Sequence, residues 1–171
     1  MADIDETPWP GEDPTDYVLR LAEEKAHAVA TPDCVVIGAD TSVVLDGEIL
    51  GKPVDRADAA ATLRRLSGRR HAVVTGVAVV VVDADGARAT TLGFERSEVE
   101  VAELSDSVIR WYVATGEADD KAGSYGLQGA GGLFADHVRG SVSNVVGLPL
   151  RRLHELCLAA GVDLLGIEAP R

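Results

Sequence analysis

Aromatic side chains are scarce in this chain, and apolar runs long enough to span a membrane are absent. Only 4% of the 171 residues are aromatic while 46% are hydrophobic, so Val, Ala and Leu must supply most of the core. A chain of this length can bury the core of one ordinary domain. No stretch approaches roughly eighteen consecutive apolar residues, so we expect no transmembrane helix.

Cysteine is equally sparse. Cys34 and Cys157 are isolated from one another, no CxxC pair occurs, and no histidines cluster beside them. This pattern argues against both a disulfide framework and a structural zinc site. The N-terminal stretch MADIDETPWPGEDP is acidic and polar, the opposite of a secretory signal peptide. Both features favour a reducing, cytoplasmic location.

Positive charge is in short supply, because the formal net charge is −12. Such a surface argues against nucleic acid or an anionic membrane as a partner, since affinity for their phosphate groups comes from basic residues. One small phosphorylated ligand is still compatible with this charge if a few cations and a divalent metal line its pocket. Among the 16 basic residues only Lys25, Lys52 and Lys121 are lysines, which makes these three candidates for such a role.

Strands and helices alternate along the chain. This alternation predicts an α/β fold with a mixed central β-sheet flanked by helices, as a single domain over residues 1–171. The turn residues Asp46 and Gly47 predict a hairpin. Helices are expected at 13–30, 56–66, 106–115 and 150–160, strands at 34–39, 71–82, 88–102 and 133–138, and a loop without apolar periodicity at 117–133.

The stretch CVVIGADTSVVLDGEILGKP, residues 34–53, places polar groups after an apolar strand. Asp40 and Thr41 follow the expected strand, where α/β sheets hold ligand groups, and Lys52 follows the hairpin. A carboxylate in this position is therefore a candidate catalytic group. Taken alone, Asp40 is also typical of a residue that caps a turn.

A second polar stretch, DDKAGSYGLQGAGG, is rich in glycine, and we refer to its residues 119–132 as the Gly-rich loop. Its glycines surround Lys121 and Gln128. Backbone N–H groups of such loops can approach a phosphate closely, and lysine adds charge. An ordinary flexible loop has the same composition. Lys25, which follows two glutamates, is likewise typical of a solvated helix face.

Seven short blocks occur in an order and spelling that carry a family resemblance. They are DIDE (3–6), LAEEKA (21–26), GADT (38–41), LGKP (50–53), SGRRHAVVTGV (67–77), ATGEADDKAGSYGLQG (114–129) and RGSVSNVVGLP (139–149). Together they resemble the Maf-like nucleoside triphosphate pyrophosphatases over nearly the whole chain, and they contain all three lysines. The resemblance implies a two-lobed fold similar to Maf and inosine triphosphatase proteins, with the site in a central cleft.

The resemblance also implies an activity: hydrolysis of a nucleoside triphosphate between the α- and β-phosphates, with Mg²⁺ or Mn²⁺ as cofactor. Asp40 would accept the proton of the attacking water, Glu6 and Asp40 would hold the metal, and Lys25, Lys52 and Lys121 would surround the triphosphate. The residue types suit this chemistry, because metal and ammonium groups stabilise developing phosphate charge while a carboxylate activates water.

Two positions extend the resemblance to substrate choice. Thr41 directly after Asp40, and Gln128 in the GLQG block, are similar to the branch of the family that prefers dTTP and UTP. A glutamine amide both donates and accepts hydrogen bonds, so Gln128 would read a pyrimidine edge. A homodimer is a further expectation from the resemblance.

One family segment, a loop of the type SxSPRR, has no counterpart in this sequence. We therefore expect one of two cases: the natural protein starts further upstream and is longer and active, or the chain is N-terminally short and lacks an arginine clamp on the phosphates. Losing such a charge-assisted contact costs a few kcal/mol, or a factor of about 10² in rate. The alternative function is then a catalytically impaired nucleotide-binding or regulatory protein linked to cell division or septum formation.

Overall fold

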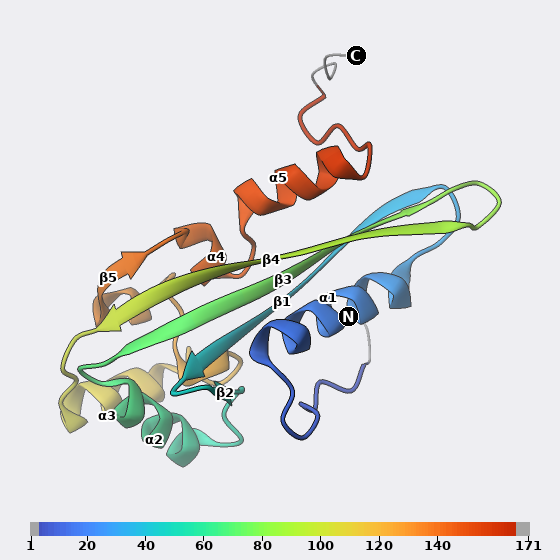
Figure 1. Cartoon of the computed structure of the whole chain (residues 1–171). Helices are drawn as coiled ribbons and strands as arrows, with labels where there is room; N and C mark the ends of the chain where they lie inside the picture. The colour runs from blue at the N-terminus through green and yellow to red at the C-terminus, as the bar shows by residue number, and fades with distance from the viewer. Residues whose placement is uncertain (1–3, 167–171) are drawn as a thin grey trace. The chain divides into compact units, whose positions relative to one another are not determined.

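The computed structural model describes residues 4–166 and shows a five-stranded sheet flanked by helices (Figure 1). The strands are β1 Cys34–Leu45, β2 Glu48–Leu50, β3 Arg70–Val82, β4 Arg88–Val101 and β5 Ala135–Arg139, in the order β2-β1-β3-β4-β5. The helices are α1 Pro14–Val29, α2 Arg56–Leu66, α3 Asp106–Thr115, α4 Val142–Val146 and α5 Leu150–Ala159. The predicted α/β class with a helix-flanked central sheet is confirmed.

Asp3, which opens the DIDE block, lies outside the described residues. None of the helices within residues 4–166 is long and apolar enough to span a bilayer.

The strand directions differ from the mixed sheet that we predicted, because the sheet is antiparallel. β1 and β2 form the predicted hairpin, whose turn residues Asp46 and Gly47 both have positive φ, +54° and +84°. A short turn closed by the Asp83 N–H and the Ala87 carbonyl joins β3 to β4. Short connections of this kind join antiparallel strands, whereas parallel neighbours need a long crossover.

The chain forms two compact units. Of the described residues, the first unit comprises 4–40, 75–95 and 147–166, and the second comprises 41–74 and 96–146. The division in β1 therefore falls directly after Asp40.

In the first unit, both faces of β3 are covered. Ala78, Val80 and Val82 pack with α1, while Val77 and Val79 pack with α5. Burial on both faces explains why this strand is a nearly continuous apolar run in the sequence. In the second unit, a separate core gathers side chains from α2, α3 and the strands.

Capping residues confirm most of the predicted helix boundaries. Asp13 accepts a hydrogen bond from the Thr15 N–H at 2.8 Å at the start of α1. Asp55 does the same for the Asp58 N–H at 2.8 Å at the start of α2. Gly116, with φ +82°, ends α3 in the left-handed conformation that favours glycine.

Two predictions about local structure were wrong. The predicted loop 117–133 contains two short 3₁₀ helices, η1 Ala122–Ser124 and η2 Ala130–Phe134. The segment after Gly140, where we predicted no helix, forms α4. This helix begins after Ser141, whose hydroxyl accepts a hydrogen bond from the Asn144 N–H at 3.2 Å. All three are short elements without a full apolar period, so periodicity gave no signal for them.

The prediction that the strand ends before Asp40 was also wrong, since β1 continues to Leu45. The residues after Asp40 include Thr41 and the valines 43 and 44, which favour extended backbone. The Asp40 carboxylate is satisfied by a contact from α1, so its burial does not force the strand to stop. Asp40 is therefore a residue within a strand rather than a turn cap.

Candidate active site

Lys25 of α1 contacts two carboxylates in the first unit. Its Nζ lies 2.5 Å from Oδ1 of Asp40, on β1, and 2.7 Å from Oε1 of Glu6, in the segment before α1. The three side chains are only partly exposed: 25% for Lys25, 11% for Asp40 and 38% for Glu6. The structure thus brings together three of the predicted site residues from three different segments.

Two glycines allow α1 to lie close enough to the sheet for this contact. A Cβ atom at Gly38 would lie 2.1 Å from the carbonyl oxygen of Ala22, and one at Gly76 would lie 2.3 Å from that of Val18. No side chain fits at either distance, so only glycine permits this helix–strand spacing. Gly38 lies two residues before Asp40, and its close approach to α1 helps to place that carboxylate beside Lys25.

The charges of this cluster change the pKa values of its members. Burial lowers the pKa of Lys25, but hydrogen bonds to Asp40 and Glu6, reinforced by their charges, outweigh burial and raise the net pKa above its ordinary value. Burial, reinforced by the negative charges of Asp40 and Glu6, raises the pKa of Tyr17 to about 12. The Tyr17 hydroxyl therefore stays protonated and donates to the Glu6 carbonyl at 2.8 Å.

Glu6 and Asp40 present the oxygen ligands that Mg²⁺ and Mn²⁺ prefer. Because both carboxylates contact one ammonium group, the contacting oxygens lie at most about 5 Å apart. Within residues 4–166, no group of three or more His, Cys, Asp or Glu side chains is arranged to hold a metal ion. Mg²⁺ usually needs only one or two carboxylates beside substrate phosphates and water. The pair therefore fits an ion that arrives with a phosphorylated ligand.

The other two lysines lie in the second unit, on segments joined by a backbone hydrogen bond. The Gly51 carbonyl, next to Lys52, accepts from the Gly123 N–H of η1 at 3.1 Å. Lys121 Nζ lies 2.5 Å from Asp120 Oδ1. The hydrogen bond from Lys121, with a smaller contribution from the charge of Lys52, lowers the pKa of Asp120. Both lysines therefore act on the same carboxylate.

Buried tyrosines hold the Gly-rich loop in place. The Tyr112 hydroxyl accepts a hydrogen bond from the Gly126 N–H at 3.2 Å, and the Tyr125 hydroxyl lies 2.9 Å from His71 Nε2. Gln128 is exposed on the same loop. The loop is thus an anchored element that presents a lysine and an amide, rather than a plain connection.

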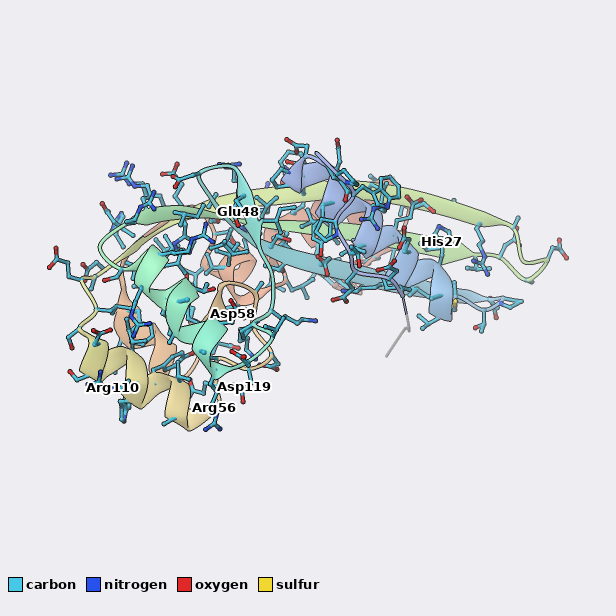
Figure 2. All side chains as sticks on the ribbon, turned by 90° about the horizontal axis from the view of Figure 1, so that it is seen from below. His27, Glu48, Arg56, Asp58, Arg110 and Asp119 are labelled. Atoms are coloured by element: carbon cyan, nitrogen blue, oxygen red, sulfur yellow. The ribbon has the colours of Figure 1, made fainter. Side chains whose placement is uncertain are left out.

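The surroundings of this loop are visible in Figure 2, which shows Asp119, the first residue of the loop, near Arg56 and Asp58 of α2. α2 packs against η1. Thr41, the remaining predicted residue, is partly buried in β1, directly after Asp40 and in the second unit.

Two side chains that support these residues were not predicted from the sequence. Tyr17 holds the backbone of Glu6, and His71 holds Tyr125. Tyr17 carried one usable signal, a hydroxyl on the apolar face of a predicted helix, since a buried tyrosine hydroxyl usually has a partner.

Comparison with known proteins identifies the family. The model of the Maf family, described as Maf-like protein, matches residues 1–160. The chain belongs to the Maf family. Its relatives include proteins named dTTP/UTP pyrophosphatase in Anaeromyxobacter dehalogenans (strain 2CP-C), 55% identical over 168 residues, and in Aromatoleum aromaticum, 48% identical over 170 residues. Each alignment covers 95% of this Maf chain, and 82% and 80% of the respective relative.

One solved structure resembles this Maf chain more distantly. It is a nucleoside-triphosphatase, also named dITP/XTP pyrophosphatase, from Mycobacterium abscessus. The two chains are 18% identical, with a TM-score of 0.40, and the match covers 95% of this chain and 81% of the other.

Proposed function

We propose that this Maf-family chain is a nucleoside triphosphate pyrophosphatase that converts dTTP and UTP to the monophosphate and pyrophosphate. The observation that carries the proposal is the contact of Lys25 with Asp40 and Glu6, at 2.5 and 2.7 Å. An ammonium group between two carboxylates, on a buried helix–strand contact, is typical of a site for charged chemistry. The names of the relatives supply the substrate class.

Asp40 is the proposed proton acceptor for the attacking water. Its carboxylate is nearly buried and is oriented by Lys25, so it is held in one position before the substrate arrives. A general base needs that fixed placement, because it must lie within hydrogen-bond reach of the proton it removes. Once a triphosphate is bound, the protonated Lys25 is also available to its oxygens.

Glu6 and Asp40 would hold the divalent cation. When bound, Mg²⁺ or Mn²⁺ neutralises phosphate charge and favours departure of the pyrophosphate. Glu6 is the more accessible of the two proposed metal ligands, because its side chain is 38% exposed against 11% for Asp40, and a metal ligand needs accessible lone pairs.

Lys52, Lys121 and the backbone of the Gly-rich loop are the proposed phosphate ligands of the second unit. Two lysines beside Asp120 make this surface locally less acidic than the net charge of −12 would imply. Gln128 and Thr41 are the proposed determinants of base choice. Gln128 is exposed, and its amide can both donate to and accept from a pyrimidine edge.

The test is a substrate panel with separate detection of both products. The purified chain would be incubated with dTTP, UTP, CTP and 7-methyl-GTP, each with Mg²⁺ or Mn²⁺. We expect pyrophosphate from dTTP and UTP, and little orthophosphate. Release of orthophosphate alone would indicate a phosphatase, and nucleotide binding without any turnover would favour the regulatory alternative.

A further inference from the structure

Arg20 of α1 fixes the chain segment that carries Glu6. Its Nε and Nη2 each lie 2.8 Å from a different oxygen of the Glu12 carboxylate, and Nη2 also donates to the Thr7 carbonyl at 3.4 Å. The side chains of Arg20 and Glu12 are 13% and 5% exposed. A bidentate arginine–carboxylate pair of this kind is both stronger and more directional than a single contact.

Trp9 completes the arrangement around the guanidinium. The Arg20 Cζ lies 4.3 Å from the centre of the Trp9 ring and 5.5 Å from that of Tyr17, within the range of cation–π contacts. The backbone N–H of Trp9 also donates to Glu12 Oε2 at 2.9 Å, and the backbone N–H of Glu12 donates to the Trp9 carbonyl at 3.0 Å. These contacts explain why the segment before α1 carries Trp9, an exposed aromatic residue.

The segment before α1 (dark blue in Figure 1) is therefore attached to the helix at three points. Tyr17 binds the backbone of Glu6, and Arg20 binds the backbone of Thr7 and the carboxylate of Glu12. These contacts leave the Glu6 side chain directed at Lys25, beside Asp40. We name the group of Trp9, Glu12 and Arg20 the Arg20 clamp.

We propose that Arg20 is a positioning residue that sets the affinity of the Glu6 and Asp40 carboxylates for a divalent cation. The inference rests on the proposed function for the importance of that cation, and it adds a residue that touches neither substrate nor metal. Without the clamp, Glu6 belongs to a segment that must be ordered each time a cation binds. That ordering opposes binding, and removal of such supporting partners typically weakens metal affinity 10- to 100-fold.

The main test compares Arg20→Met, which keeps much of the aliphatic stem, with Arg20→Lys, which keeps the charge but not the fork. Arg64→Met is the matched control, because Arg64 makes an exposed ion pair with Asp106 at 2.8 Å, on α2 in the second unit. Binding of Mn²⁺ would be followed by electron paramagnetic resonance with a nonhydrolysable dTTP analogue present, because the carboxylate pair fits an ion that arrives with a phosphorylated ligand. We expect Arg20→Met and Arg20→Lys to weaken Mn²⁺ binding about 10-fold or more, and Arg64→Met to bind like the wild type.

A second variant and a second readout separate positioning from general stability. Tyr17→Phe removes only the hydroxyl that binds the Glu6 carbonyl, so it should weaken Mn²⁺ binding while leaving the melting temperature nearly unchanged. Hydrogen exchange should be faster over residues 4–13 in Arg20→Met. Wild-type Mn²⁺ affinity in folded Arg20→Met and in Tyr17→Phe would overturn the proposal, whatever the change in stability.

The same variants distinguish this inference from the proposed function. If the wild-type chain releases no pyrophosphate from dTTP but Arg20→Met still loses Mn²⁺ affinity, the positioning role stands and the proposed function is wrong. If the wild type hydrolyses dTTP and Arg20→Met shows the same Mn²⁺ dependence of that rate, the positioning role is wrong and the proposed function stands.

Discussion

The buried imidazole of His71 makes the stability of the chain depend on pH in a defined direction. The residue is 3% exposed, its Nε2 lies 2.9 Å from the Tyr125 hydroxyl, and the two rings meet edge to face at 5.6 Å. Burial lowers the pKa of His71 from 6.5 to about 4. The folded chain therefore keeps this imidazole neutral under conditions in which the unfolded chain protonates it.

The size of the effect follows from the two pKa values. Between pH 6.5 and pH 4 the unfolded chain binds a proton at His71 that the folded chain does not bind. The free energy of unfolding therefore falls as the pH falls through this window, by up to about 1.4 kcal/mol per pH unit, and this contribution is constant above it. From pH 7.5 to pH 5.0 the loss from this one residue amounts to about 2 kcal/mol.

The assay is urea unfolding of the wild type and of His71→Gln at pH 7.5 and 5.0. Glutamine can still bond to the Tyr125 hydroxyl but does not titrate, and subtracting the two pH dependences cancels the shared contribution of the carboxylates. We expect the wild type to lose about 2 kcal/mol more than the variant between the two pH values. Parallel losses would refute the reasoning, because they would show that His71 has the same pKa in the folded and unfolded chains.

Three further predictions follow from single contacts. Gly38→Ala places a Cβ against the Ala22 carbonyl, so it should lower the free energy of unfolding in urea by about 1–3 kcal/mol and also lower the rate of dTTP hydrolysis. An unchanged rate would contradict the helix–strand spacing. Lys121→Met should raise the KM for dTTP about 10-fold or more in a pyrophosphate-release assay, and an unchanged KM would remove Lys121 from the phosphate ligands. Asp55→Ala removes the N-cap of α2 and should cost about 1 kcal/mol in stability without a change in KM; a wild-type midpoint of unfolding would argue against the cap.

Much of the helical structure was predictable because its signals are local. Asp13, Asp55 and Ser105 cap helices within three residues, and Gly116 ends a helix at a position that needs positive φ. The Asp46 and Gly47 hairpin is similarly local. Such signals depend on neighbouring residues alone, so the sequence displays them directly.

The course of β1 was not predictable in the same way. Whether a strand continues through Asp40 depends on a partner for its carboxylate, and that partner, Lys25, lies on a helix 15 residues earlier. The role of Gly38 was not predictable either. Gly38 is required by the short distance between α1 and β1, and the sequence of neither element reports that distance.

The candidate site was predictable in part. The scarcity of lysine indicated Lys25, and the apolar stretch that precedes Asp40 indicated that carboxylate. In the structure Asp40 Oδ1 lies 2.5 Å from Lys25 Nζ. The support for Glu6 was not visible, because Arg20 resembles any solvated arginine of a helix until Glu12 folds back onto it. The supporting role of Arg20 depends on contacts between segments, and the residue pattern along one segment does not indicate such contacts.

The most direct test of the proposed active site is a comparison of turnover and binding in Asp40→Asn. The rate of pyrophosphate release from dTTP would be measured with saturating Mg²⁺, together with the affinity for a nonhydrolysable dTTP analogue. If Asp40 activates the attacking water, the rate should fall about 10²-fold or more while the analogue binds within a few-fold of the wild-type affinity. A variant that hydrolyses dTTP at the wild-type rate would contradict the assignment of Asp40 and, with it, the proposed reaction centre.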